Sequence, residues 1–268
     1  DGTINKIKTF KNIKLIISKG ATIAKGRNIA VKNAKYPIIA MTDAGCICDK
    51  NWLRDISKPF KKTKTQVVAG FYRMSGESSF QKALKPFLGI MPDKFNEYNF
   101  LPSTRSVAFK KITWKKLGGF SEKFDRAGED TDFNIKIIKK NIEIVRVKSA
   151  IVNWEVPNNL ISSLKKFFFY AKGDVQSGNY LTSHNIKVLS IFVRYLVFIS
   201  LSLFIFIYTP LVIVFVLIFS LYLTWSVYKH RRFIKGWKAW GYTAIIQIAS
   251  DFAVMAGFLS GTWDILSR

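Results

Sequence analysis

The sequence predicts an α/β domain followed by helices that cross a membrane. Three observations lead to this prediction. Up to residue 187, short apolar segments of strand length alternate with segments of helical periodicity. Beyond residue 187 the apolar residues accumulate, and one long stretch carries no charge. Basic residues flank that stretch, as they do at the cytoplasmic border of membrane spans.

The charge balance favours an acidic partner. The chain of 268 residues has 42 Lys and Arg against 17 Asp and Glu, a formal net charge of +25. Nucleic acid, an anionic membrane surface or phosphorylated ligands could neutralise this charge, although each single lysine is most simply a solvated surface residue. We favour anionic membrane lipid, because the basic residues flank hydrophobic spans. Nucleic acid is not expected as a partner, since the basic residues are scattered without a recognition motif.

Cysteine and histidine are too scarce for several classes of site. Cys46 and Cys48 form one Cys-X-Cys pair, and the two histidines are His184 and His230. A zinc site and a Cys/His nucleophile are therefore not expected, and a Ser/His/Asp hydrolase would have to use one of these two histidines. We expect both cysteines to be reduced, partly buried thiols.

The first elements predict a strand, a helix and a second strand. The chain begins at Asp1 with no initiator Met, signal peptide or preceding strand, so its start looks cut. Residues 15–17 predict a short buried strand, residues 20–34 a helix, and residues 37–41 a strand that ends at Asp43. Ligands of parallel sheets bind beyond the carboxyl ends of the strands. Asp43 is therefore expected beside a ligand.

Further elements follow in the same style. The pattern predicts a helix over residues 49–60, a strand over 66–72, a long connection over 74–102 and a strand over 107–109. After the acidic stretch described next, it predicts two short strands over residues 142–147 and 150–154. A connection as long as residues 74–102 is usually a functional loop or carries short helices of its own.

Three carboxylates lie within four residues at the start of a helix. The segment Gly128-Glu129-Asp130-Thr131-Asp132 precedes apolar residues at helical spacing, and Asn141 can close the helix. An acidic first turn is often only a cap that complements the helix dipole. Here a glycine pair, Gly118-Gly119, and a polar loop precede the acids, which indicates the edge of a crevice.

The chain then approaches the membrane. Residues 160–172 contain four consecutive aromatic residues beside Lys165 and Lys166, which suits an amphipathic helix in the membrane interface. The alternative is a helix packed on the core of the domain. We place the domain boundary after residue 185, which gives an α/β domain over residues 1–185 and a membrane domain over residues 186–268.

The membrane domain predicts a helical hairpin. Residues 195–228 carry no charge, and a single helix of that length would exceed a hydrocarbon core of roughly 30 Å, so the stretch folds back at Pro210. We expect spans over residues 188–208 and 211–228, with Arg194 snorkelling near the start of the first span.

The end of the chain is ambiguous. A basic loop over residues 229–238 belongs in the cytoplasm by the positive-inside rule, and two crossings then place the α/β domain there as well. Residues 239–262 are apolar but contain Gln247 and Asp251. They form either a third span or an interfacial hairpin, since a carboxylate within a span is costly unless it is paired or functional. We expect a multi-pass protein of the cell membrane.

Several short motifs follow one another along the first 174 residues. They are Asp1-Gly2-Thr3, Gly20 through Arg27-Asn28, Thr42-Asp43-Ala44-Gly45, Gly118-Gly119-Phe120 with Gly128-Glu129-Asp130, and Tyr170 with Gly173-Asp174. In this order they resemble the motifs of family 2 glycosyltransferases, enzymes of the GT-A fold that use nucleotide-sugar donors. The resemblance implies a Rossmann-like mixed sheet with helices on both faces, incomplete at the N-terminus, where the aspartate that grips the nucleobase would lie.

The resemblance also implies the roles of individual residues. A sugar hydroxyl that attacks an anomeric carbon loses a proton, and Asp130 is the expected general base. The other expected site residues are Glu129 beside the base, the donor-binding residues Arg27, Asn28, Asp43 and Arg105, and Asp43 again as a ligand of Mg²⁺ or Mn²⁺. Alternatively, Arg27 is an exposed helix residue and Arg105 is a charge at a strand edge. Gly45 replaces the second aspartate of the family's metal motif, so the metal would take ligands from phosphates and water.

The sequence therefore predicts an inverting transferase of the type that builds cell-envelope polysaccharides. It would pass a sugar from a nucleotide-sugar donor to a lipid-linked or glycan acceptor at the cytoplasmic membrane face. The alternative is a catalytically inactive relative that serves as a membrane scaffold or partner protein. Gly45 and the missing first strands favour the alternative, and the intact Gly128-Glu129-Asp130 motif favours the enzyme more strongly.

Overall fold

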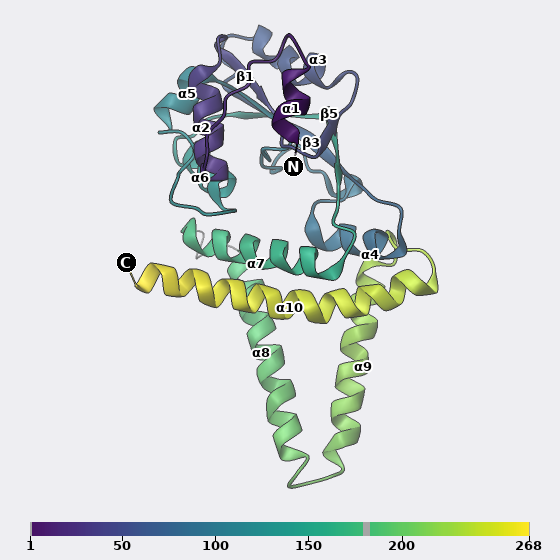
Figure 1. Ribbon diagram of the computed structural model, residues 1–268. Coiled ribbons are helices and arrows are strands. Elements are labelled where there is room, and N and C mark those ends of the chain that lie inside the picture. The colour runs from purple at the N-terminus through teal and green to yellow at the C-terminus, as the bar shows by residue number, and fades with distance from the viewer. Residues whose placement is uncertain (1, 179–182, 268) are drawn as a thin grey trace.

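The computed structural model describes residues 2–178 and 183–267. Figure 1 shows an α/β part, a hairpin of two long helices that projects from it, and a third long helix between them. The sheet contains β1 (Ile38–Met41), β2 (Cys46–Cys48), β3 (Val67–Ser75), β4 (Val107–Lys110) and β5 (Ile144–Glu155). Its order is β1-β4-β3-β5-β2, with β3 parallel to β5 and every other pair antiparallel. The predicted mixed sheet is confirmed.

Short helices surround the sheet. They are α1 (Thr3–Lys8), α2 (Ile23–Asn33), α3 (Trp52–Ser57), η1 (Lys58–Lys61), α4 (Ser79–Leu88), η2 (Pro92–Lys94), α5 (Lys111–Lys116) and α6 (Glu129–Lys139). Helices α2, α5 and α6 lie on one side of the sheet and α3 on the other (Figure 1). The long connection therefore carries short helices, α4 and η2, as one of its two interpretations predicts.

Two predictions about strands are wrong. Residues 15–17 form no strand, and Ile16 and Ile17 are exposed, because no neighbouring strand pairs with this segment and β1 pairs only with β4 among the described residues. The expected parallel strand-helix-strand unit is therefore not formed. Residues 142–147 and 150–154 belong to one strand, β5, which pairs with β3 along its length across an irregularity after Val147. That irregularity interrupts the alternation of side chains, so the sequence reads as two strands.

The acidic helix is positioned by aromatic packing. Phe133 of α6 and Phe120 of the preceding loop are buried against Phe109 of β4, with ring centroids 4.6 to 6.2 Å apart. Such contacts fix a helix on a sheet through apolar burial and ring geometry. They hold the first turn of α6 beside the edge of the sheet formed by β4 and β1.

Among the described residues, four helices follow β5, and the last three belong to the membrane part. They are α7 (Leu160–Gln176), α8 (Ser183–Phe204), α9 (Leu211–His230) and α10 (Trp237–Leu266). In the described part of the chain, three helices are long and apolar enough to cross a membrane, namely α8 from Ile186 onward, α9 and α10. The predicted hairpin is confirmed, and Pro210 lies directly before α9. Helix α10 runs across the ends of α8 and α9 instead of beside them (Figure 1).

Glycines let α7 and α10 pack backbone to backbone. A Cβ atom on Gly257 would lie 2.2 Å from the carbonyl oxygen of Phe168, and one on Gly261 would lie 2.8 Å from that of Lys172. Lys172 also pairs with Asp264 at 2.8 Å. Helix α7 is thus packed between α10 and the α/β part, as Figure 1 shows. Helix α7 therefore packs within the protein, as the alternative interpretation of residues 160–172 predicts. Contact of α7 with the membrane interface stays a prediction.

A buried polar cluster joins the three long helices. Asp251 of α10 accepts hydrogen bonds from Tyr222 of α9 and, at 2.9 Å, from Gln247. Arg194 of α8 pairs with Asp251 at 3.2 Å. Arg194 therefore does not snorkel to the surface as predicted, because the buried carboxylate requires a partner.

Candidate active site

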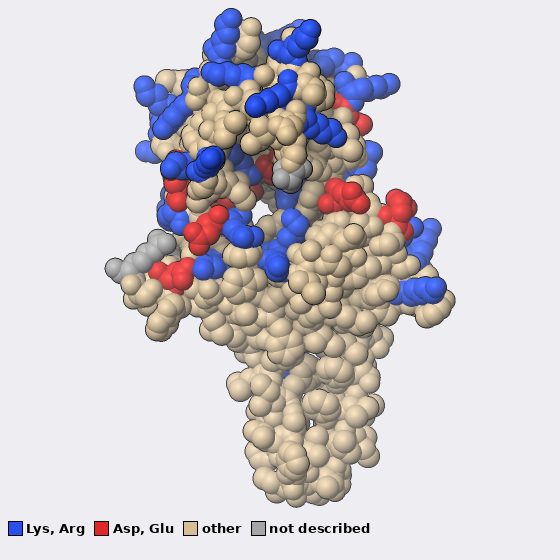
Figure 2. Space-filling view, in the orientation of Figure 1, with Lys and Arg blue, Asp and Glu red and all other residues tan. Residues whose placement is uncertain are grey.

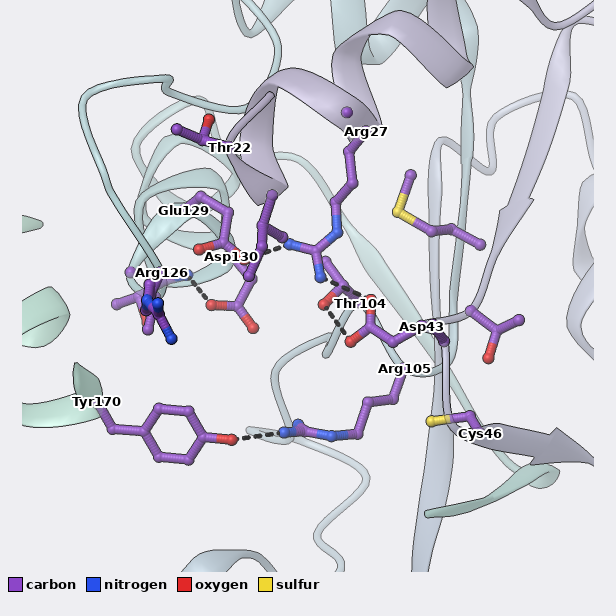
Figure 3. Close-up of a pocket in the computed structure, with 18 of the residues that line it drawn as sticks. Thr22, Arg27, Asp43, Cys46, Thr104, Arg105, Arg126, Glu129, Asp130 and Tyr170 are labelled. Atoms are coloured by element: carbon purple, nitrogen blue, oxygen red, sulfur yellow. Dashed lines mark hydrogen bonds and ion pairs between the residues drawn. The ribbon is translucent and has the colours of Figure 1, made fainter. Parts of the chain in front are cut away.

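The structure has a cavity of about 750 Å³ between the sheet edge, α6 and α7 (Figure 3). It is lined by residues that come from the start of α2, the segment after β1, the segment before β4, the start of α6 and one face of α7. Among the predicted site residues, it brings together Arg27, Asp43, Arg105, Glu129 and Asp130.

Strand pairing explains how Asp43 and Arg105 meet. Met41 of β1 lies opposite Val107 of β4 in an antiparallel pair, so the end of one strand and the start of the other share one edge. Asp43 accepts a hydrogen bond from Thr104 at 3.1 Å across that edge. Asp43 therefore follows the end of β1 and lines the cavity, but this placement results from an antiparallel pair and not from the predicted parallel one.

Arg27 joins the two acidic segments. Its guanidinium donates to Asp43 at 2.6 Å and pairs with Glu129 through its other terminal nitrogen. The side chain of Arg27 is 14 % exposed, which excludes an ordinary surface arginine. Helix α2 begins just before it, with Thr22 as the cap, whose hydroxyl accepts from the backbone N–H of Lys25 at 3.3 Å. Figure 3 shows Arg27 pointing between the two carboxylates.

Arg105 is held by aromatic side chains. Its guanidinium donates to the hydroxyl of Tyr170 at 2.8 Å and lies over the ring of Trp154, 4.0 Å from the ring centroid. It also donates to the hydroxyl of Ser103 at 3.0 Å. Arg105 is therefore fixed at the cavity wall by a stacked, hydrogen-bonded contact and is not a free strand-edge charge.

Asp130 and Glu129 occupy the first turn of α6. Burial raises the pKa of both carboxyls. The charge of Asp130 raises the pKa of Glu129 further, and the nearby Arg27 lowers the pKa of both. Asp130 also accepts from the backbone N–H of Thr131 at 2.9 Å. A partly exposed carboxylate of raised pKa at a cavity wall is a suitable proton acceptor.

Close backbone contact fixes this turn against α7. Gly128 has φ 108°, and a Cβ atom on it would lie 2.8 Å from the backbone of Gly173. A Cβ atom on Gly173 would lie 2.4 Å from the carbonyl oxygen of Ala127. Thr131 donates to Asp174 at 3.4 Å beside this contact. The glycine and aspartate in the motif of α7 therefore support the acidic motif of α6.

Asn28 does not line the cavity. It is 6 % exposed, and its amide accepts from the backbone N–H of Phe120 at 2.9 Å and donates to the carbonyl oxygen of Phe120 and to Glu122, each at 2.8 Å. The expected contact of Asn28 with a donor is thus replaced by a structural role. Asn28 holds the loop that contains Gly118-Gly119-Phe120 against α2.

Two further cations line the cavity, and the sequence did not identify either of them as a site residue. Arg126 lies over the ring of Phe169, and Lys166 lies over the ring of Trp154, 5.2 and 5.4 Å from the centroids. Burial and then Arg105 lower the pKa of Lys166. Arg126 lies two residues before Gly128 of the acidic motif, and Lys166 precedes Tyr170 by one helical turn, so proximity to the motifs could have identified both.

The donor set for a metal is small. In residues 2–178 and 183–267, no group of three or more His, Cys, Asp or Glu side chains is arranged to hold an ion. Asp43 offers one carboxylate, whose oxygens accept from Arg27 and Thr104. A Mg²⁺ or Mn²⁺ ion can fit here if it takes its other ligands from substrate phosphates and water.

The comparison with known families decides the class of the α/β part. Residues 1–119 match the family model described as Glycosyl transferase family 2. Over this stretch, 119 of 268 residues, the chain is similar to the family 2 glycosyltransferases. Its predicted GT-A fold class agrees with the mixed sheet, and the resemblance deduced from the motifs is confirmed. The match ends before Glu129 and Asp130, and Asp1 lies outside the described residues.

Solved glycosyltransferases resemble the domain at low identity. A mannosyltransferase from Pyrobaculum calidifontis in complex with GDP-Man and Mn²⁺ is 14% identical, with a TM-score of 0.49, over 100% of this chain and 64% of that chain. S. aureus TarS 1-349 in complex with UDP-GlcNAc is 14% identical, with a TM-score of 0.43, over 64% of this chain and 53% of that chain. The chain thus spans less than two thirds of the length of either structure. No curated protein sequence matches it.

Proposed function

We propose that this protein transfers a sugar from a nucleotide-sugar donor to a lipid-linked or polymeric acceptor at the cytoplasmic face of a membrane. The family 2 match supports the donor class. The observation that carries the proposal is the cavity of about 750 Å³, which brings Asp43, Arg105 and Asp130 together from three separate segments.

Asp130 is the general base in this proposal. The acceptor hydroxyl oxygen attacks the anomeric carbon of the donor sugar, and its proton passes to the carboxylate of Asp130. As the new carbon–oxygen bond forms, the bond from the anomeric carbon to the diphosphate oxygen breaks, and the electron pair leaves with the nucleoside diphosphate. Attack from the face opposite the leaving group inverts the anomeric configuration. Glu129 serves beside the base by holding Arg27.

Cationic side chains stabilise the leaving diphosphate. Arg105, Arg126 and Lys166 line the cavity, and preorganised positive charge is most effective where negative charge develops. A divalent ion bound at Asp43 would supply further charge neutralisation. Arg27 connects Asp43 to Glu129 and so fixes the distance between the donor side of the cavity and the base.

The membrane part brings the acceptor to the cavity. With the α8–α9 hairpin across the bilayer, α10 and α7 lie along its surface, and α7 lines the cavity through Lys166 and Tyr170. Anionic lipid holds juxtamembrane basic residues with about 1 kcal/mol each, and the positive-inside rule places them in the cytoplasm. An acceptor at the membrane surface thereby reaches the base from the α7 side.

Titration calorimetry with a panel of nucleoside diphosphates tests the donor class. The purified protein in detergent is titrated with and without Mn²⁺. We expect one nucleoside diphosphate to bind and Asp43→Ala to weaken its Mn²⁺-dependent binding. Unchanged metal-dependent binding in this variant would contradict the role of Asp43, and no binding by the wild type would contradict the donor class. Binding without sugar transfer to membrane extracts would favour the inactive scaffold.

A further inference from the structure

A second hollow lies where the α/β part meets the membrane part. It has a volume of about 200 Å³ and is lined by Asp93, Lys94, Lys229, Arg231, Arg232 and Phe233. Helix η2 of the α/β part supplies the first two residues, and the end of α9 with the loop that follows supplies the others. The hollow therefore joins two parts of the chain that are separated by well over 100 residues.

The four cations of this hollow have no carboxylate partner among the described residues. In the part of the chain that the structure describes, neither the two lysines nor the two arginines form an ion pair, and the single lining acid, Asp93, forms none either. Lys94 lies over the ring of Phe233, 5.5 Å from its centroid. Arg231 lies 3.5 Å from the ring centroid of Tyr228 and donates to its carbonyl oxygen at 2.9 Å. The cations of the hollow are thus held by aromatic contacts, and a bound anion would reduce the repulsion between their like charges.

The position along α9 indicates which anion lies nearest. The helix is uncharged from Leu211 to Tyr228, and Lys229 is its first charged residue. On the face that Figure 2 shows, the projecting hairpin is almost free of Lys, Arg, Asp and Glu, whereas charged residues appear from the level of α10 upward. The first basic residues after a membrane span lie among the lipid headgroups. The hollow is therefore at the depth of lipid phosphates.

We propose that this hollow binds the phosphate group of an anionic membrane lipid. The guanidinium groups of Arg231 and Arg232 suit bidentate contact with phosphate oxygens, and the lysines add point charges. Because Lys94 comes from the α/β part, one phosphate fastens that part to the loop after α9. This site is distinct from the sugar-transfer cavity and does not depend on the proposed function.

Native mass spectrometry of the whole chain in detergent tests the site. Phosphatidylglycerol and phosphatidylcholine are offered in equal amounts, inorganic phosphate is offered in a separate run, and the bound lipid or phosphate is counted. The wild type retains phosphatidylglycerol in preference, and Lys94→Gln with Arg232→Gln weakens this binding about thirtyfold, as expected for the loss of two basic contacts. Lys235→Gln with Lys238→Gln is the matched control, because it removes the same charge from the loop after α9 and the start of α10, outside the hollow. The control stays within about twofold of the wild type, because neither lysine lines the hollow and exposed charges away from it are screened.

Three results would overturn the proposal. Equal weakening by both pairs would mean diffuse attraction of the basic loop. Equal retention of the two lipids by the wild type would mean no anion site. Weakened binding of inorganic phosphate with unchanged phosphatidylglycerol would mean a site for soluble phosphate. The charge-preserving pair Lys94→Arg with Arg232→Lys separates charge from folding, since it must keep the lipid preference.

Discussion

The contact between Gly173 and the turn that carries Asp130 gives the sharpest structural prediction. A Cβ atom on Gly173 would lie 2.4 Å from the carbonyl oxygen of Ala127, whereas ordinary contact begins at 3.4 Å. The backbone of α7 and the start of α6 must therefore separate by about 1 Å in Gly173→Ala, the difference between these two distances.

Two opposing effects set the size of the change. Alanine in place of glycine inside a helix stabilises it by up to about 1 kcal/mol, and overpacking costs roughly 1–3 kcal/mol. We expect net destabilisation of about 1 kcal/mol and a melting temperature a few degrees lower. A displacement of about 1 Å near the reacting groups costs on the order of a hundredfold in rate. Sugar transfer is therefore expected to fall far more than stability.

Gly241→Ala is the control for Gly173→Ala. It is the same change within helix α10, where nothing lies within 4 Å of the added Cβ atom, so the helix-propensity gain stands alone. Thermal unfolding in detergent and transfer assays are run on both variants. The reasoning is refuted if Gly173→Ala raises the melting temperature as Gly241→Ala does and transfers sugar at the wild-type rate.

Three further predictions concern the pH dependence, the membrane cluster and the topology. Because burial raises the pKa of Asp130, transfer rises with pH through a pKa above the ordinary aspartate range, and a flat pH profile would argue against its role as base. Asp251→Leu leaves the half-buried Arg194 without its partner and is expected to destabilise the protein by about 3 kcal/mol, measured by thermal unfolding, whereas Asp251→Leu with Arg194→Leu recovers most of the loss. In a cysteine-free background, Thr209→Cys should react with an impermeant reagent on intact cells and Gly236→Cys should not, and the reverse labelling would place the domain outside.

Local patterns were sufficient for part of the site. The acidic turn could be predicted because Gly128 precedes it in a loop, and the structure gives this glycine a left-handed backbone at the start of α6. Arg27 could be placed near a donor through its motif. Its ion pairs could not be predicted, because Asp43 and Glu129 meet only through tertiary packing. The motif was misleading for Asn28, because this residue holds a loop of the fold through hydrogen bonds and does not line the cavity.

Long-range geometry explains the remaining errors. Composition shows that α10 is apolar, but its direction across α8 and α9 depends on the pairing of Asp251 with Arg194, which are 57 residues apart, and on glycine contacts with α7. The apolar residues 15–17 read as a strand because periodicity contains no information on whether a neighbouring strand is present.

The most direct test of the central claim is single-turnover sugar transfer by Asp130→Asn. The side chain keeps its shape and loses its basicity, so transfer is expected to be abolished while the nucleoside diphosphate binds with nearly wild-type affinity. Transfer near the wild-type rate with unchanged donor binding would contradict the assignment of Asp130 as the general base.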